Sequence, residues 1–256
     1  MTASPFNLTG RVAIVTGGNG GIGLSMARGL AHAGAHVAVV GRNAAKSKAI
    51  LGQLTSHGVK AISVTADVTR AADVSAAITK VKAAFGRIDI LINNAGISVR
   101  KPPQDLSLDE WDSVIRTNLT SAFICSQAVY PEMKAAGGGK IINIGSMLSI
   151  FGTSYGAAYA ASKGGIVQFT RSLAVAWAPD NIQANAVLPG WIDTELTQTA
   201  RAEVDGLNDK VLARTPAARW GHVGDMSGVA VFLASAASDF ITGAAIPVDG
   251  GFSIAG

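Results

Sequence analysis

Short runs of consecutive apolar residues alternate along this chain with longer segments in which apolar residues recur every three or four positions. The short runs predict buried β-strands, because a strand covered on both faces has no polar side. The longer segments predict helices with one apolar face. Strands are expected at Val12–Thr16, Val37–Val40, Ala61–Thr65, Ile88–Ile92, Lys140–Ile144, Ile182–Val187 and Ala245–Val248. Helices are expected after the glycines of 17–23 to about Ala33, from Asn43 to about Ser56, and at about 71–85, 107–136, 157–178 and 225–235.

This alternation predicts an α/β fold, a doubly wound parallel sheet of about seven strands with helices on both faces, as in Rossmann-like proteins. No break in composition and no long linker divides residues 1–256, so we expect a single domain. The stretch 191–220 has no strand signal and begins after Pro189-Gly190. Because open α/β sheets bind ligands at the carboxyl ends of their strands, we expect this stretch to form a helical lid over the substrate. An ordinary surface insertion is the alternative.

A glycine-rich turn, Thr16-Gly17-Gly18-Asn19-Gly20-Gly21-Ile22-Gly23, joins the first predicted strand to the first helix. Glycine permits a tight turn and a close approach of the backbone to a pyrophosphate, which the helix N-terminus then favours. The turn matches both G-x-G-x-x-G and T-G-x-x-x-G-x-G. At a strand-to-helix junction, this spacing predicts a dinucleotide site.

The end of the second predicted strand reads Val39-Val40-Gly41-Arg42-Asn43 and carries no acid. A carboxylate at this point would bind the ribose 2′-hydroxyl of NAD(H) and repel a 2′-phosphate. An arginine fork binds a phosphate through two hydrogen bonds. Arg42 therefore favours NADP(H) over NAD(H), although Gly20 leaves the glycine turn without a second basic residue.

Charge is distributed unevenly along the chain. Residues 1–66 contain six Lys and Arg but no Asp or Glu, whereas the whole chain of 256 residues has a net charge of +4. The six bases are dispersed, and Phe6 is the one aromatic residue among them, so a nucleic-acid site is disfavoured. A small phosphorylated ligand accounts for the asymmetry better.

Compartment and metal binding are constrained by what the sequence lacks. No apolar run approaches the length of a membrane span, and the first ten residues do not resemble a signal peptide. The single cysteine, Cys125, fits a reducing cytoplasm and is expected to be a buried structural thiol. The four histidines have no metal-ligand spacing, so no metal is expected.

Tyr159 and Lys163 stand in a Y-x-x-x-K spacing, and Ser146 precedes them. On a helix, positions i and i+4 share one face, so the phenol and the ammonium group can converge. A cation beside a phenol favours the phenolate and brings its pKa toward neutrality. A nearby serine can hold the oxygen at which a proton moves. The trio therefore predicts interconversion of carbonyl and alcohol; Tyr155 has no lysine four residues on.

Together these motifs resemble the short-chain dehydrogenase/reductase family over almost the whole chain. Beyond the glycine turn, the resemblance rests on Asp67-Val68, on Asn93-Asn94-Ala95-Gly96, on Asn118, on Pro189-Gly190 with Thr194, and on Val248-Asp249-Gly250-Gly251. It implies a catalytic tetrad of Asn118, Ser146, Tyr159 and Lys163. It also implies cofactor contacts from Gly17, Asn19, Gly20, Gly21, Ile22, Gly23, Arg42, Asn43, Asp67, Val68, Asn94, Ala95, Gly96, Tyr159, Lys163, Pro189, Gly190, Ile192 and Thr194.

The same resemblance implies a role for each member of the tetrad. Tyr159 is expected to be the general acid in reduction and the base in oxidation, and Ser146 to orient the substrate oxygen. Lys163 is expected to lower the pKa of Tyr159 and to hydrogen-bond the nicotinamide ribose. Asn118 is expected to hold a water that joins Lys163 to a proton relay. The family also assembles commonly as dimers or tetramers, so a homotetramer is expected.

The substrate is less constrained than the reaction. Residues expected to line its pocket are mainly apolar: Ile97, Ser98, Met147, Leu148, Tyr155, Trp191, Ile192 and Leu196. They include no arginine pair suited to a carboxylate, so the sequence favours an NADPH-dependent reductase of a neutral ketone. A sugar or sugar-acid dehydrogenase of the glucose or gluconate type is the first alternative, and a 3-oxoacyl thioester reductase the second. A cofactor-sensing regulator is the alternative that is not an enzyme.

Overall fold

The apolar residues of each strand divide between two cores, one on each face of the sheet. In the computed structural model, which describes residues 4–255, β1 (Val12–Thr16) sends Ala13 and Val15 into one core. Its Val12 and Ile14 enter the other core. Successive side chains of a strand point to opposite faces, so a strand without a polar side requires helices on both sides.

Seven strands form one parallel sheet in the order β3-β2-β1-β4-β5-β6-β7. The strand order reverses between β1 and β4, and such a switch point is where doubly wound sheets bind ligands. This topology confirms the predicted fold class. The other strands are β2 (His36–Gly41), β3 (Ala61–Thr65), β4 (Ile90–Asn93), β5 (Gly139–Ile144), β6 (Ile182–Pro189) and β7 (Ala245–Val248).

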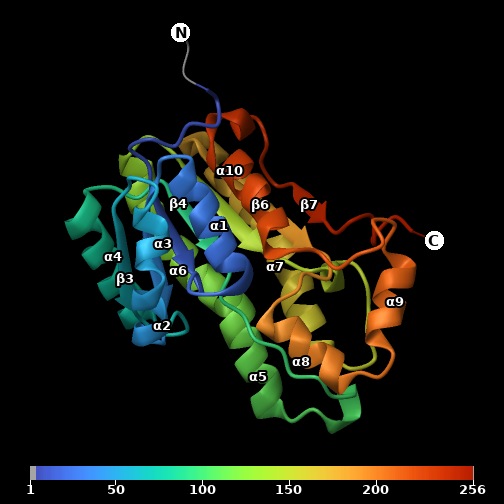
Figure 1. Ribbon diagram of the computed structural model, residues 1–256. Helices are drawn as coiled ribbons and strands as arrows, with labels where there is room; N and C mark the ends of the chain where they lie inside the picture. The colour runs from blue at the N-terminus through green and yellow to red at the C-terminus, as the bar shows by residue number, and fades with distance from the viewer. Residues whose placement is uncertain (1–3, 256) are drawn as a thin grey trace.

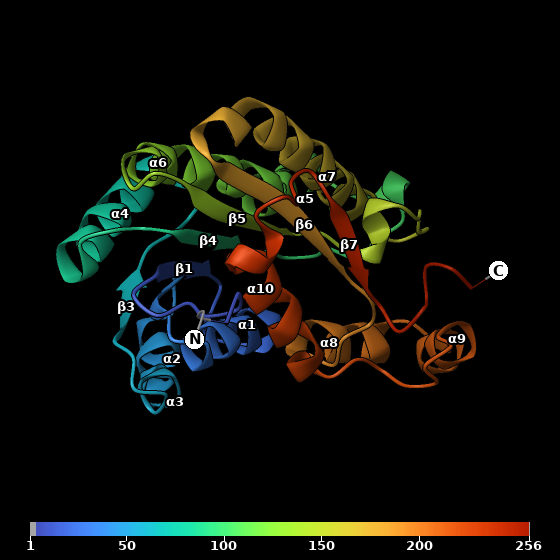
Figure 2. The ribbon, with the colours of Figure 1, turned by 90° about the horizontal axis from the view of Figure 1, so that it is seen from above.

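Two layers of helices enclose the sheet (Figures 1 and 2). One layer contains α1 (Gly21–His32), α2 (Ala44–Ala49), α3 (Leu51–Thr55) and α10 (Ser227–Ala234). The opposite layer contains α4 (Ala71–Phe85), α6 (Ser121–Ala135) and α7 (Ala157–Trp177), with α5 (Leu108–Ile115) leading into α6. No helix among residues 4–255 is both long enough and apolar enough to cross a membrane.

The long helix predicted at 107–136 is interrupted. A π-helical turn, Arg116–Thr120, separates α5 from α6, and the Ser121 N–H donates to the Arg116 carbonyl five residues back. Such turns are frequent at functional sites because they redirect one side chain. Here the turn contains Asn118, which is only 2% exposed. Apolar periodicity does not reveal this extra residue, since the flanking helices keep the same period.

Two other helices also depart from the prediction. The helix expected from Asn43 to Ser56 divides at Ile50 into α2 and α3, although Asn43 caps it as expected by accepting from the Lys46 N–H at 2.9 Å. The helix expected at 225–235 starts as a 3₁₀ turn and becomes α-helical at Ser227. The 3₁₀ turns lie at Pro103–Asp105, Met147–Ser149, Ala178–Asp180, Val223–Met226 and Ala236–Ser238.

The segment 191–220 forms two short helices, α8 (Glu195–Glu203) and α9 (Leu207–Arg214). Leu207 and Val211 pack with Trp191 and Trp220 in a small core separate from those of the sheet. Figure 2 shows α8 beside the end of α10 and α9 farther out, toward the C-terminus. The helical excursion expected from the sequence is therefore present.

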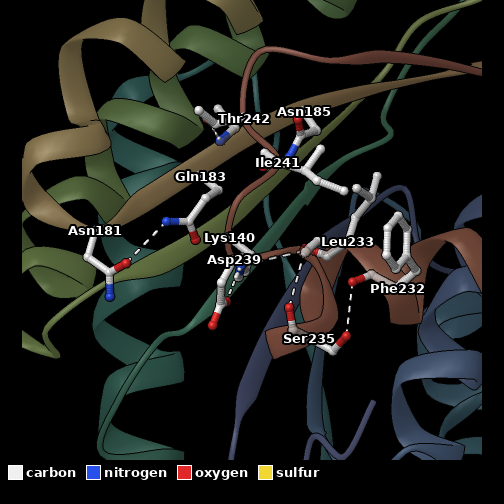
Figure 3. A network of polar contacts seen from close by, with 12 residues as sticks. Lys140, Asn181, Gln183, Asn185, Phe232, Leu233, Ser235, Asp239, Ile241 and Thr242 are labelled. Atoms are coloured by element: carbon white, nitrogen blue, oxygen red, sulfur yellow. Dashed lines mark hydrogen bonds and ion pairs between the residues drawn. The ribbon is translucent and has the colours of Figure 1, made fainter. Parts of the chain in front are cut away.

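A polar network fastens the segment before β7 to β5 and β6 (Figure 3). Lys140, at the amino end of β5, is 9% exposed, and its Nζ donates to Asp239 Oδ1 at 2.7 Å. Asn185 of β6 donates through Nδ2 to the Ile241 carbonyl at 2.8 Å and accepts from the Ala244 N–H at 3.0 Å. These bonds lie away from the carboxyl ends of the strands, and they stabilise that part of the sheet.

Candidate active site

A cavity of about 290 Å³ opens at the carboxyl ends of β4, β5 and β6. Ser146, Tyr159 and Lys163 line it together, although they come from a loop and a helix. Ile192 also lines it, whereas Ile97 lines a neighbouring cavity. Apart from Ile97, the residues placed in the substrate pocket from the sequence line the catalytic cavity: Ser98, Met147, Leu148, Tyr155, Trp191 and Leu196.

Tyr159 and Lys163 occupy successive turns of α7. The Lys163 Nζ lies 5.6 Å from the centre of the Tyr159 ring, as the i, i+4 spacing predicts. Lys163 is 4% exposed, and its Nζ donates to the Ile144 carbonyl at the end of β5 at 2.6 Å. The lysine is thus held at the base of the cavity by the strand beneath it.

The loop after β5 holds Ser146 in place. The Ser146 N–H donates to Ser149 Oγ at 3.1 Å, and Ser149 Oγ donates to the Lys163 carbonyl at 2.7 Å. The Ser146 hydroxyl accepts from the Leu148 N–H at 3.1 Å. Ser149 therefore connects the serine loop directly to the helix that carries Tyr159 and Lys163. The sequence motifs did not single out Ser149.

Asn118 joins the loop after β4 to α7. Its Oδ1 accepts from the Ile97 N–H at 2.8 Å, and its Nδ2 donates to the Ile97 carbonyl and to Ser162 Oγ, both at 3.0 Å. Ser162 Oγ in turn donates to the Tyr159 carbonyl at 2.7 Å. The side-chain amide of Asn118 therefore acts as a clamp. A water relay from Lys163 past Asn118 stays a prediction.

Burial is the main influence on the ionisation of the pair. Burial raises the pKa of Tyr159, while a hydrogen bond from Ser146 and the charge of Arg100 lower it without reversing the rise. Burial lowers the pKa of Lys163 to about 8. That Lys163 lowers the pKa of Tyr159 stays a prediction, and the groups that act against the rise in this structure are Ser146 and Arg100.

The expected cofactor residues lie along two adjoining cavities. A second cavity of about 310 Å³ contains Gly17, Asn19, Arg42, Asn43, Asp67, Val68, Ala95 and Gly96. The catalytic cavity contains Ile22, Asn94, Gly96, Pro189, Gly190, Ile192 and Thr194. Gly96 borders both, so a molecule as long as a dinucleotide could extend from the end of β2 to Tyr159. Lys46 also lines the second cavity, a basic residue that the sequence motifs did not reveal.

The glycine turn is packed against Asn94. Asn94 Nδ2 donates to the carbonyls of Thr16 and Gly17 at 3.1 Å each, and it occupies the space that a Cβ on Gly23 would need. Gly17 has a φ of +62°, a conformation that favours glycine. Gly20 faces the Lys46 ammonium and Gly21 faces Thr194 at the start of α8. Glycine is therefore required at 17 and 23 by the turn itself.

Comparisons with known proteins decide the family. A family model described as short chain dehydrogenase matches residues 11–205. The chain belongs to the short-chain dehydrogenase family. It is 42% identical over 254 residues to a 2-dehydro-3-deoxy-D-gluconate 5-dehydrogenase of Formosa agariphila, covering 98% of this chain and 96% of that protein. It is 44% identical over 253 residues to the protein of the same name from Escherichia coli, covering 98% and 99%.

Solved structures of the family have the same fold. A gluconate 5-dehydrogenase of Burkholderia cenocepacia, crystallised in complex with NADP and tartrate, matches with a TM-score of 0.94 and 43% identity over 98% of each chain. As a short-chain dehydrogenase, the protein is an oxidoreductase that interconverts a hydroxyl and a carbonyl group. Family membership thus confirms the reaction class that Tyr159 and Lys163 predicted.

The catalytic cavity of this dehydrogenase is lined by three basic side chains, Arg100, Lys163 and Arg214, and by no acidic one among residues 4–255. The expectation that the pocket has no arginine pair is therefore wrong. Arg100 follows β4, and Arg214 ends α9 more than a hundred positions later. Only the path of segment 191–220 over the cavity brings them together, and neither periodicity nor a motif reveals that path.

Several other reactive or charged side chains lie outside the proposed chemistry. Cys125 is buried, and burial raises its pKa to about 12, so the thiol stays protonated as expected of a structural cysteine. Asp193 pairs with Arg201, and Glu195 with Lys46. Within residues 4–255 no cluster of three or more His, Cys, Asp or Glu side chains is arranged to hold a metal ion.

Proposed function

We propose that this dehydrogenase interconverts a hydroxy sugar acid of the gluconate type and the corresponding keto acid, with NADP(H) as cofactor. The observation that carries the proposal is the charge of the catalytic cavity. Two arginines and a lysine line it and no acid does, and although Arg100 pairs with Glu203, Arg214 has no ion-pair partner among residues 4–255. A carboxylate substrate gains from this field, whereas a neutral ketone does not. The names of the relatives, gluconate and 2-dehydro-3-deoxy-D-gluconate 5-dehydrogenases, support the same substrate class.

The residues at the end of β2 fit a phosphorylated cofactor. Arg42, Asn43 and Lys46 line the second cavity beyond Gly41, where an acid would be expected for NAD(H). Arg42 and Lys46 together supply the basic pair that the glycine turn lacks. The homologous Burkholderia enzyme was crystallised with NADP, which supports the same preference here.

The chemistry then follows from the site. When bound, the nicotinamide accepts the hydride from the alcohol carbon or returns it to the carbonyl carbon. Tyr159 takes the hydroxyl proton during oxidation and gives it back during reduction, while Ser146 holds the same oxygen. Arg100 favours the phenolate of Tyr159 by its charge. Lys163, buried beneath them, is placed to pass the proton on and to hold the nicotinamide ribose.

Segment 191–220 is proposed to close over the substrate as a lid. Trp191, Leu196 and Ala200 line the catalytic cavity, so this segment forms part of its wall. Lys46 of α2 contacts both carboxylate oxygens of Glu195 at 3.0 Å, an ion pair that links the start of α8 to the cofactor side. A homotetramer and a cytoplasmic location remain predictions from family resemblance and cysteine content.

The sequence-based preference for a neutral ketone rested on the absence of an arginine pair, and that premise is wrong. A thioester reductase and a cofactor-sensing regulator have no specific observation in their favour.

The test is turnover by the purified protein of D-gluconate, D-glucose and an aryl alcohol, each with NADP⁺ and NAD⁺, followed by absorbance of the reduced nicotinamide. We expect oxidation of the sugar acid with NADP⁺ at a higher kcat/KM than any neutral substrate. Tyr159→Phe should lower kcat by about 10²–10⁴-fold. Tyr130→Phe, whose hydroxyl bonds Asp180 outside the cavity, should not. Turnover of neutral substrates without any sugar acid would overturn the proposal.

A further inference from the structure

Arg214 is held in an unusual environment at the wall of the catalytic cavity. It is the last residue of α9, and its guanidinium carbon lies 4.6 Å from the ring centre of Phe151 and 4.4 Å from that of Phe252. Phe151 follows the serine loop after β5, and Phe252 follows β7. All three side chains line the cavity. Three segments that are distant in sequence thus converge to fix one guanidinium group.

The two aromatic rings restrict the orientation of this group while leaving its hydrogen-bonding edge uncommitted. Cations are attracted to ring faces, and a planar guanidinium stacks on them. Within residues 4–255, the Arg214 guanidinium has no ion pair and no hydrogen bond to another side chain. Pre-organisation lowers the entropy lost when a ligand binds. A planar, charged fork of this kind suits a carboxylate, which it can bind through two parallel hydrogen bonds.

Arg100, the other cavity arginine, is already engaged. Its Nη1 donates to Glu203 Oε2 at 3.0 Å and its Nη2 to the Leu196 carbonyl at 2.9 Å, and both partners lie in α8. Arg201 provides a second contrast, since it stacks on Trp220 at 4.2 Å but pairs with Asp193. Of the two arginines that line the cavity, Arg214 is therefore the one whose guanidinium N–H groups are available to a ligand.

Position within the cavity indicates which part of the substrate reaches Arg214. Tyr159 lies on α7 beside the buried Lys163, whereas Arg214 ends α9 in the segment 191–220 and contacts Phe151 and Phe252 at another part of the cavity wall. A substrate that meets Arg214 and Tyr159 at once carries its anionic group away from the carbon that is oxidised. A sugar acid that is oxidised near the end of its carbon chain opposite the carboxylate meets this requirement.

We propose that Arg214, held against the rings of Phe151 and Phe252, binds the substrate carboxylate and is the residue that selects acids over neutral polyols. The inference rests on the proposed function and identifies the group that recognises its substrate class. The carboxylate takes the two donor nitrogens on the exposed edge of the guanidinium. The reacting hydroxyl is then directed toward Tyr159 and Ser146.

The test compares D-gluconate with D-gluconamide, which has the same hydroxyl groups but a neutral amide in place of the carboxylate. In wild type we expect gluconate to have a KM about 10–100-fold lower, the value of a charged hydrogen-bonded pair. Arg214→Met should raise the KM for gluconate by about that factor, leave kcat within a few-fold and leave the KM for gluconamide unchanged. Arg214→Lys should recover part of the preference, since it restores charge without the fork.

Arg201→Met serves as the matched control, because it removes a stacked arginine from the same segment but outside the cavity lining. It should leave the ratio of the two KM values unaltered. If Arg214→Met does not fold, as judged by its thermal melt, Arg214→Lys carries the measurement. Equal losses for both substrates, or an unchanged gluconate KM, would overturn the role of Arg214 while leaving the proposed function intact. A wild type that turns over no sugar acid would instead overturn the proposed function.

Discussion

Among residues 4–255 two lysines are buried, and they lie at opposite ends of the strand β5. Lys140, near the amino end of β5, is 9% exposed, and Lys163 contacts the carbonyl of Ile144 at the carboxyl end and is 4% exposed. Burial lowers the pKa of both. Lys140 has Asp239 as a partner at 2.7 Å, and this carboxylate counteracts part of the fall in its pKa. Lys163 has no carboxylate partner within residues 4–255.

The presence or absence of a carboxylate partner distinguishes a structural lysine from a candidate catalytic lysine in the same sheet. A paired, buried ammonium group stays charged and ties two segments together, as Lys140 ties the segment before β7 to β5 (Figure 3). An unpaired one costs stability, but it titrates close to neutral pH and can exchange protons. Within residues 4–255, the buried lysine without a carboxylate partner therefore lies at the end of β5 where proton transfer is proposed.

The largest effect should come from removing the unpaired lysine. Lys163→Met should lower kcat by about 10²–10⁴-fold, the contribution typical of a positioned proton-transfer group. The substitution keeps the length of the buried stem, so the loss should appear in steady-state kinetics with gluconate and NADP⁺ at saturating concentrations. Activity within threefold of wild type would contradict the catalytic role of Lys163.

The same lysine should make stability depend on pH. Its pKa is about 8 in the folded protein and near 10.5 in the unfolded chain, so the unfolded state binds more protons between these values. The free energy of unfolding should therefore rise with pH across that window, by up to about 3 kcal/mol from this group. Below pH 8 Lys163 is charged in both states, so the full free-energy cost of burying its ammonium group is present.

Lys163→Met isolates this contribution. The variant should lack the rise, and at pH 7 it should be more stable than wild type by about 1–2 kcal/mol, since the lost hydrogen bond to Ile144 is worth less than the penalty. Urea denaturation at pH 7 and pH 10 measures both. A parallel pH dependence in wild type and variant would show that Lys163 is not the group responsible.

The sequence predicted Lys163 as a candidate catalytic residue, but it did not predict the residues that surround Lys163. The spacing to Tyr159 follows from helical geometry, and the order of apolar runs predicted all the strands of the sheet, because both depend on neighbouring residues. Ser149 and the π turn at Asn118 were missed, since their role depends on contacts between distant segments. Arg214 was missed for the same reason: its aromatic partners lie far from it in sequence, in the serine loop and beyond β7.

Removing the paired lysine should have a smaller effect, and on stability alone. Lys140→Met breaks the contact with Asp239, whose side chain is largely exposed, and also removes an ammonium group that burial disfavours, so the unfolding free energy should change by less than about 1 kcal/mol. kcat should stay within twofold of wild type, because the network lies away from the cavity. Lys80→Met, at an exposed position of α4, is the control and should change neither quantity. A larger fall in activity than in stability would contradict a structural role for Lys140.

Small effects should also come from the serines beside the two lysines. Ser149 Oγ fastens the Lys163 backbone to the loop of Ser146, whereas Ser238 Oγ bonds the carbonyls of Leu233 and Ser235 near Lys140. Each bond is worth about 1 kcal/mol. Ser149→Ala should therefore lower kcat about fivefold through misplacement of Ser146. Its KM for NADP⁺ should be unchanged and its pH profile shifted little, which distinguishes displaced geometry from an altered ionisation. Ser238→Ala should lower the melting temperature by a few degrees without changing kcat, because its bonds lie within the turn after α10, away from the catalytic cavity.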